Sequence, residues 1–176
     1  MPVPKGKPVC TSTWPDANLM HDLVTGRSVS GILHLVNQTP IDWFSKRQGC
    51  VESATYGSEF VAHRQATEQI MDLRYTLRML GVPLTGPSYM FGDNSSVITS
   101  STIPHSSLTK RHNALAYHQV REAIAANIIY LFKAHTIDNP ADVLTKFLLC
   151  AIFWPLIQPL LFWHGDTKEC KDGLST

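Results

Sequence analysis

Short apolar runs separated by turn residues occupy the first third of the chain. A first strand is predicted over residues 10–14, and Pro15 is expected to end it just before Asp16. A second strand covers 28–37, and a cluster of turn residues separates it from a returning strand over 41–46. The pattern predicts an antiparallel hairpin or meander.

The spacing of apolar residues changes to a helical period further along the chain. Spacings of three and four predict one long helix, capped by Ser53 or Thr55 and ended by residues 81–83, with an apolar stripe of Ile70, Leu73, Leu77 and Leu80. Glu59 lies eleven residues before Ile70, which is about three turns plus roughly 20°. Glu59 therefore shares the face that points to the core, where a carboxylate needs a partner.

The remaining elements alternate between strand and helix. We expect a buried strand over 89–91, a brief helix over 95–100, a helix over 112–127 and a strand over 128–134. A last helix begins at Asp138 or Asn139, with Pro140 in its first turn. The order of three strands, a helix, a strand, two helices, a strand and a helix predicts an α/β fold, a mixed sheet with helices on its faces.

Composition limits the classes of protein that fit this pattern. The 176 residues are 44% hydrophobic and 16% charged, which favours one domain with a core and excludes disorder over most of the length. A net charge of +1 gives no general affinity for polyanions, so contact with nucleic acid would need a local patch. Four widely spaced cysteines predict neither a zinc site nor a disulfide framework, and the first residues lack the apolar region of a secretory signal.

Residues 147–163 form an almost continuous apolar run interrupted by Pro155 and Pro159. A membrane span needs about 20 apolar residues, so contact with a membrane is the less favoured interpretation. We expect a short helix and a bend, part of which folds back on the domain while the rest docks on a protein partner.

Four acidic residues occupy comparable positions near the ends of the predicted elements: Asp16, Glu59, Asp93 and Asp142. Carboxylates gathered at one end of a sheet repel each other unless a cation neutralises them, and a pair of hard divalent ions about 4 Å apart suits the cleavage of a phosphodiester. Each aspartate alone could be an ordinary turn, cap or helix-start residue. Glu59 has no such ordinary explanation.

The same positions carry a family resemblance. The stretches that carry it are Asp16–Asn18 with 25–31, then 40–48, 58–62, 91–97, 109–112 with 117–122, and Asn139-Pro140-Ala141-Asp142-Val143-Leu144-Thr145-Lys146. In order and spacing, this region from about 14 to 147 resembles the ribonuclease H domain of copia-type (Pseudoviridae) retrotransposon polyproteins. The sequence departs from that family at Pro15, at Asn18, where a second acid is common, and at Gly57, where a glutamate is common.

The resemblance implies a ribonuclease H-like fold, with a mixed five-stranded sheet and helices on both faces. It places this domain at 14–147, between an irregular lead-in (1–13) and an apolar extension with a polar tail (148–176). It further implies hydrolysis of the RNA strand of RNA–DNA hybrids, with Asp16, Glu59, Asp93 and Asp142 holding two Mg²⁺ or Mn²⁺ ions. The implied partner is the polymerase domain of a reverse transcriptase, which this sequence lacks, and the implied locations are cytoplasmic virus-like particles and the nucleus.

Other polar residues have two interpretations each. His135, in the loop before Asp142, could shuttle protons or simply face solvent. Lys110 and Arg111 could contact backbone phosphates or form a solvated helix start, and Asn94 and Ser95 could contact an RNA 2′-hydroxyl or cap the brief helix.

Two alternatives to a ribonuclease H enzyme stay open at this stage. The first is a catalytically silent protein that keeps the fold as a scaffold and uses its apolar segment in a larger, possibly membrane-associated, assembly. The second is an integrase-like domain, which would leave the Asn-Pro-Ala-Asp stretch unexplained. The four intact acids favour the enzyme over both.

Overall fold

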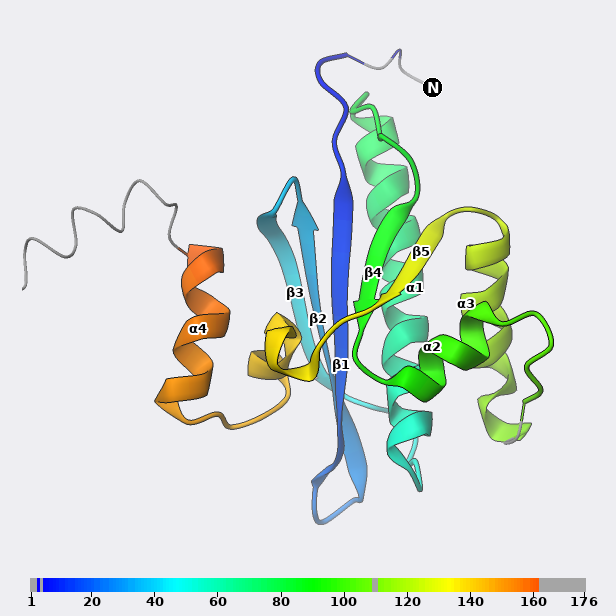
Figure 1. The fold of residues 1–176 in the computed structure, drawn as a ribbon, viewed down its shortest axis with the longest axis vertical. Helices are drawn as coiled ribbons and strands as arrows, with labels where there is room; N and C mark the ends of the chain where they lie inside the picture. Colours follow the sequence, from blue (N-terminus) through cyan, green and yellow to red (C-terminus); the bar gives the residue numbers. More distant parts are fainter. Residues whose placement is uncertain (1–2, 4, 109–110, 162–176) are drawn as a thin grey trace, which may run out of the picture.

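A computed structural model describes Val3 and residues 5–108 and 111–161 (Figure 1). Its five strands are β1 (Thr11–Asp22), β2 (Arg27–Val36), β3 (Thr39–Arg47), β4 (Ser88–Gly92) and β5 (Ile129–Lys133). They form one sheet in the order β3-β2-β1-β4-β5, antiparallel among the first three strands and parallel from β1 through β4 to β5. The predicted mixed five-stranded sheet is confirmed.

The helices of the described residues lie on both faces of this sheet. They are α1 (Thr55–Met79), α2 (Ser95–Thr102), η1 (Arg111–Asn113), α3 (Ala114–Ala125), η2 (Thr136–Asp138), η3 (Pro140–Leu144) and α4 (Cys150–Leu161). The helices α1 and α3 cover one face, where a core of Ile32, Ala66, Ile70, Met90, Val120, Ala123, Ile129 and Leu131 is buried (Figure 1).

The short helix η3 packs on the opposite face. His34 points to the α1 face, because its Nε2 lies 2.9 Å from Gln69 Oε1 in α1. Gly31 lies three residues before His34 on β2, so it points the other way. A Cβ at Gly31 would lie 2.6 Å from Thr145 Cγ2, which means that the missing side chain allows η3 and the turn after it to approach the sheet.

The prediction that Pro15 ends the first strand is wrong. Strand β1 continues to Asp22, and Pro15 pairs with Ile32 of β2. The parallel pairing with β4 stops at Thr13, two residues before the proline that has no N–H to offer. Asp16 therefore lies within a long strand and beside the point where the β1–β4 pairing ends.

The long helix α1 begins and packs differently from the prediction. Its N-cap is Ala54, without a side-chain hydrogen bond, and Thr55 is already helical. It ends as expected before Gly81, whose φ is +74°. Of the predicted apolar stripe, Ile70 is buried but Leu80 is 72% exposed, because the last turns of α1 extend past the end of the sheet (Figure 1).

The two later helices are shorter than predicted. The helix expected over 112–127 is a turn of 3-10 helix, η1, followed by α3. Asn139 caps the last predicted helix as expected, since its side chain accepts a hydrogen bond from Ala141 N–H. That element is the short 3-10 helix η3, because Asp142 N–H donates to the Asn139 carbonyl and Thr145 N–H to the Asp142 carbonyl, each three residues back.

The bend predicted at Pro155 and Pro159 is wrong, because α4 is one helix over Cys150–Leu161 with both prolines inside it.

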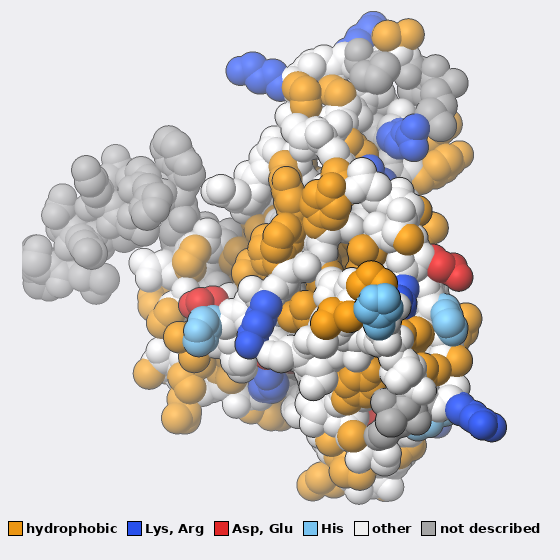
Figure 2. Space-filling model, turned by 45° about the vertical axis from the view of Figure 1, so that its right-hand side comes forward, with side chains coloured by type: hydrophobic (Ala, Val, Ile, Leu, Met, Phe, Trp, Pro, Cys, Tyr) orange, Lys and Arg blue, Asp and Glu red, His pale blue; other side chains and the backbone are white. Residues whose placement is uncertain are grey.

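Apolar side chains remain exposed on the C-terminal helix and nearby. Helix α4 contacts the rest of the fold mainly through η3 (Figure 1), and Phe147 is 98% exposed. In the space-filling view, hydrophobic side chains form a group at the centre of the visible face, whereas the charged side chains are scattered (Figure 2). None of the helices in the described part of the chain has the length and hydropathy of a bilayer span.

Candidate active site

Three of the four predicted acids converge at the end of β4. Asp16 comes from β1, Glu59 from the second turn of α1, and Asp93 directly follows β4. One carboxylate oxygen from each lies within 4.8 Å of the other two. Asp16 and Glu59 are buried, with exposed fractions of 1% and 3%. Distant parts of the sequence thus build one acidic group.

Burial and mutual repulsion raise the pKa values of two carboxyl groups in this cluster. Burial, followed by repulsion from Asp16 and Asp93, raises the pKa of Glu59 well above its ordinary value. Burial and Asp16 likewise raise the pKa of Asp93, against a hydrogen bond from Thr136. One Glu59 oxygen accepts a hydrogen bond from the backbone of Ala17, but Oε2 is buried without any partner in the described structure.

A divalent metal ion fits these residues. A buried carboxylate oxygen without a hydrogen bond is costly, and a bound cation would remove that cost. Carboxylate oxygens are the ligands that Mg²⁺ and Mn²⁺ prefer. Asp16, Glu59 and Asp93 are therefore the residues that would hold such an ion. Oε2 of Glu59, which accepts no hydrogen bond from the described residues, is the atom that most needs a cation.

A close contact between α1 and β4 brings Asp93 to Glu59. His63 lies one turn after Glu59, is fully buried, and donates from Nδ1 to the Glu59 carbonyl at 2.8 Å. A Cβ at Gly92 would collide with Nε2 of His63, so only glycine permits this approach. Burial lowers the pKa of His63 to about 4, which keeps the ring neutral beneath the acids.

The fourth predicted acid, Asp142, lies beside this group and forms an ion pair with Lys146. Lys146 Nζ is 2.7 Å from Asp142 Oδ1 and 3.4 Å from Asp16 Oδ1. Thr145 Oγ1 donates a hydrogen bond to the other oxygen of Asp16, and Asn18 Nδ2 donates to the Thr145 carbonyl. Burial raises the pKa of Asp142 to about 6, although the hydrogen bond from Lys146 acts in the opposite direction.

The other predicted site residues are placed less decisively. Asn94 caps α2, since its side chain accepts from the N–H groups of Ser96 and Val97, and Ser95 is exposed. His135 is exposed in the loop before η2, next to the Thr136 that hydrogen-bonds Asp93. Arg111 is exposed at the start of η1, and Lys110 lies outside the described residues. Their roles stay predictions.

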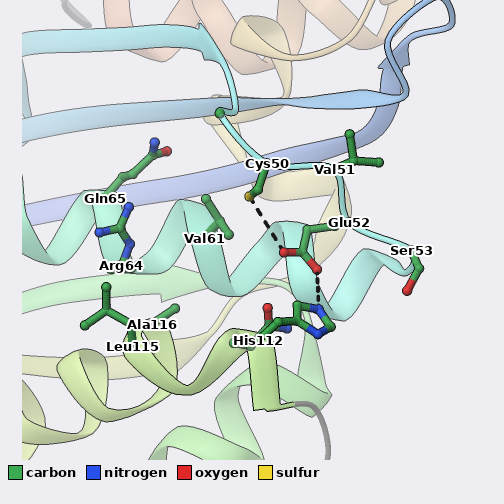
Figure 3. A pocket seen from close by; sticks show the side chains of 12 residues that line it. Cys50, Val51, Glu52, Ser53, Val61, Arg64, Gln65, His112, Leu115 and Ala116 are labelled. Carbon is green, nitrogen blue, oxygen red and sulfur yellow. Dashed lines mark hydrogen bonds and ion pairs between the residues drawn. The ribbon is translucent and has the colours of Figure 1, made fainter.

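A second buried glutamate lies at the other side of the start of α1. Glu52 is 3% exposed and borders a cavity of about 550 Å³ together with Cys50, Arg64 and His112 (Figure 3). His112 Nε2 lies 3.1 Å from Glu52 Oε2, and Cys50 Sγ lies 3.7 Å from Oε1 (Figure 3). Both oxygens of this glutamate therefore have partners within the chain.

Gly57 provides the space for Glu52. A Cβ at position 57 would collide with Glu52 Oε2 and would lie 2.8 Å from its Cδ. From the sequence, this glycine only weakens the first turns of the helix, by up to about 1 kcal/mol. In the structure it has a packing reason, because a larger residue would push the buried carboxylate out of place.

Sequence reasoning overlooked two groups of polar residues. Thr145 and Lys146 belong to a stretch that carried the family resemblance, and the spacing of four between Asp142 and Lys146 was a signal for an ion pair. Glu52 and His112 are 60 residues apart, and nothing in their local sequence links them.

Comparison with known proteins places the chain among transposon polyproteins. It is 30% identical over 134 residues to the retrovirus-related Pol polyprotein from transposon TNT 1-94 of Nicotiana tabacum, covering 76% of this chain and 10% of the polyprotein. It is 26% identical over 144 residues to that from transposon RE2 of Arabidopsis thaliana, covering 81% and 10%. No protein-family model matches the chain.

Solved structures with the same fold are ribonucleases H and reverse transcriptases. LC11-RNase H1 in complex with RNA/DNA hybrid has a TM-score of 0.59 and 10% identity, covering 77% of this chain and 93% of that one. The foamy viral protease-reverse transcriptase in complex with RNA/DNA hybrid has a TM-score of 0.54 and 15% identity, covering 81% and 20%. The chain therefore has a ribonuclease H-like fold and is a relative of the retrovirus-related Pol polyproteins of plant transposons, about a tenth of whose length it spans.

Proposed function

We propose that this chain cleaves the RNA strand of RNA–DNA hybrids in a divalent-metal-dependent reaction, as the ribonuclease H part of a copia-type retrotransposon reverse transcriptase. The observation that carries the proposal is the convergence of Asp16, Glu59 and Asp93, with the buried Glu59 Oε2 left without a partner. The fold and the relatives support the same class of reaction, since two neighbours of this fold were solved with RNA/DNA hybrid.

Different residues of the chain would have different roles in this reaction. Asp16, Glu59 and Asp93 would hold one Mg²⁺ or Mn²⁺ ion, and Asp142 together with Asp16 would hold a second. One of the two ions would activate the attacking water, and the other would stabilise the leaving 3′ oxygen. Thr145 fixes the rotamer of Asp16, and the Ala17 N–H fixes one oxygen of Glu59. The exposed His135 would accept or deliver a proton near the scissile bond, and Asn94, Ser95 and Arg111 would contact the hybrid.

Hybrid cleavage by the purified chain tests the proposal. With Mg²⁺ or Mn²⁺ and a labelled RNA–DNA hybrid, we expect the RNA strand to be cut, whereas single-stranded RNA and duplex DNA stay intact. Asp93→Asn should lose at least about 100-fold in rate, because a neutral amide holds a cation poorly. Asp72→Asn, an exposed aspartate later on α1, is the matched control and should keep the wild-type rate.

Two outcomes would contradict the proposal. Equal cleavage by wild type and Asp93→Asn would show that the acids do not form the active site. Absence of cleavage by either, with every chain folded and Mn²⁺ bound, would favour the catalytically silent scaffold.

We also propose that the exposed apolar side chains at 147–161 dock on the polymerase part of the same polyprotein. The chain spans about a tenth of its relatives, so those polyproteins contain further polypeptide on which such a surface could dock. Phe147, Leu149 and Trp154 are 98%, 77% and 46% exposed, and α4 contacts the fold mainly through η3. Burying each large side chain contributes about 1.5–3 kcal/mol. Residues 162 and 163 of the predicted docking segment lie outside the described residues.

Removal of residues 150–176 tests this docking. The shortened chain should stay folded by thermal melting and should lose binding to a purified polymerase segment from the Nicotiana tabacum relative. Unfolding of the shortened chain would show instead that α4 belongs to the core.

A further inference from the structure

The ammonium group of Lys146 lies between two acids of the site. Its Nζ is 2.7 Å from Asp142 Oδ1 and 3.4 Å from Asp16 Oδ1. Among the described residues, Lys146 is the one cation that forms an ion pair with any of the four acids, and it pairs with Asp16 and Asp142. The acids are thereby divided: Asp16, Glu59 and Asp93 converge on each other, whereas Asp142 stands outside that group with its oxygen on the lysine.

The backbone that carries Lys146 is held firmly in this position. Its N–H donates to the Asp142 carbonyl at 3.0 Å, and the preceding Thr145 is tied to Asp16 through its hydroxyl. Ser45 of β3 donates to the Leu144 carbonyl at 2.6 Å. The turn after η3 is thus hydrogen-bonded to β1 and β3. These bonds fix the backbone of Lys146 close to Asp16 and Asp142.

The side chain itself is able to leave. It is 32% exposed, and four rotatable bonds separate the fixed backbone from the ammonium. The ammonium contacts one carboxylate oxygen of Asp16 and one of Asp142. It therefore occupies the space in which a cation shared by these two acids would bind.

We infer that Lys146 is an internal competitor for the second metal ion. The chain binds one divalent cation through Asp16, Glu59 and Asp93, and a second cation enters between Asp16 and Asp142 only when the Lys146 ammonium moves out. Lys146 is thus a positioning residue, which keeps Asp142 and Asp16 oriented before the second ion arrives. The inference rests on the proposed function for its consequence in catalysis, but metal binding alone tests it.

Titration of the full chain with Mn²⁺, in the absence of any nucleic acid and at constant ionic strength, gives the measurement. Wild type should bind one ion strongly and a second weakly. In Lys146→Met the second dissociation constant should fall at least tenfold, and Lys146→Arg should return towards wild type. Lys5→Met removes the same charge beside Gly81, beyond the far end of α1, and should change neither constant more than twofold.

The sign of the effect separates competition from a structural role. A lysine that only held the site together would weaken Mn²⁺ binding when replaced, whereas a competitor strengthens it. Adding Asp142→Asn to Lys146→Met should abolish the tightened binding of the second Mn²⁺ and leave a stoichiometry of one ion per chain. Lys146→Gln, judged by the same criteria, replaces Lys146→Met if that variant does not fold.

The inference is overturned if Lys146→Met binds the second Mn²⁺ no more tightly than Lys5→Met, or if the gain survives Asp142→Asn. Both results are independent of hybrid cleavage. A chain that binds Mn²⁺ as expected but cuts no hybrid would refute the proposed function and leave the competition by Lys146 intact.

Discussion

Two glutamates near the start of α1 are equally buried, each 3% exposed, yet they stand in opposite surroundings. Glu52 faces His112 and Cys50, which contact one oxygen each. Glu59 faces Asp16 and Asp93, and one of its oxygens has no partner among the described residues. A buried carboxylate needs a compensating partner. The chain itself supplies that partner for Glu52, whereas the described residues supply none for Oε2 of Glu59.

The difference distinguishes an acid that is paired within the chain from the acid that we propose to bind metal, without reference to the family. Burial alone does not distinguish the two glutamates, and neither does their position on one segment of the chain. The identity of the neighbours does: an imidazole and a thiol neutralise or share the charge, whereas two further carboxylates increase the repulsion. The same criterion explains why the cavity beside Glu52, although well formed, is a weaker candidate for metal chemistry than the acid group.

The largest effects are expected when each of the two glutamates is replaced by glutamine. Glu59→Gln should lower the rate of hybrid cleavage by about 100-fold or more, whereas Glu52→Gln should keep it within about threefold. In EDTA the stabilities should move in opposite directions. Glu59→Gln relieves repulsion and should raise the melting temperature, whereas Glu52→Gln weakens the contact with His112 and should cost about 1–2 kcal/mol. Equal behaviour in both assays would remove the distinction.

The sequence pattern singles out Glu59 as a candidate site residue but gives no signal for the buried Glu52. Glu59 was found because its helical phase matched that of Ile70, and Ile70 is indeed buried. Glu52 precedes the helix, in a segment without periodicity, and its partner His112 lies 60 residues away. A pairing of that kind depends on how α3 packs against α1, which local patterns do not encode.

The acid group was predictable to a different degree at each position. Asp93 follows the short strand β4, and Asp142 lies in the first turn of η3, just after its Asn139 cap. Glycine, asparagine and proline mark these boundaries in the sequence, so both positions are predictable. The position of Asp16 was read incorrectly, because Pro15 ends a strand only if the missing N–H was needed, and here the β1–β4 pairing has already stopped. The bond from Thr145 to Asp16 joins residues 129 apart and depends on the tertiary fold alone.

A second test fills the space that Glu52 uses. Gly57→Ala favours the helix intrinsically by up to about 1 kcal/mol, but its Cβ would collide with the buried carboxylate. We expect a net loss of about 1–3 kcal/mol in the free energy of unfolding, as for overpacking of a core. Gly49→Ala, in the same segment but with nothing within 4 Å of the added Cβ, should change stability by less than about 0.5 kcal/mol. A stabilised Gly57→Ala would mean that Glu52 moves away freely and is not held by its partners.

A third test uses pH to detect the raised pKa of Asp142. The pKa of Asp142 is raised in the folded chain to about 6, so its stabilising contribution is present at low pH and is lost as the pH rises through 6. Burial lowers the pKa of His63 and of His34, and their contributions are lost instead as the pH falls below about 6.5. Comparison of wild type with Asp142→Asn cancels the histidines, since both chains contain them.

In EDTA, the advantage of Asp142→Asn over wild type should therefore grow between pH 4.5 and pH 7.5. We expect a gain of about 4–8 °C in relative melting temperature, since a pKa of about 6 corresponds to about 2 kcal/mol over this pH range and 1 kcal/mol to about 2–4 °C in a domain of this size. Excess Mg²⁺ at pH 7.5 should stabilise wild type more than the variant and so reduce that advantage. A difference that stays constant with pH would show that burial and the neighbouring acids do not raise the pKa of Asp142.

The smallest effects are expected from the two partners of Glu52. Cys50 Sγ lies 3.7 Å from its carboxylate and is a weak donor, so Cys50→Ser should change the free energy of unfolding by less than about 0.5 kcal/mol. His112 makes the shorter contact of 3.1 Å, but its side chain is 54% exposed, and solvent screening should limit the loss in His112→Ala to about 1 kcal/mol. Chemical denaturation of both variants, with hybrid cleavage measured in parallel, gives the comparison. Cleavage should stay at the wild-type rate in both, because neither residue contacts the acid group. If His112→Ala instead lost activity as strongly as Glu59→Gln, the cavity beside Glu52 would belong to the functional site, and the criterion of self-supplied partners would fail.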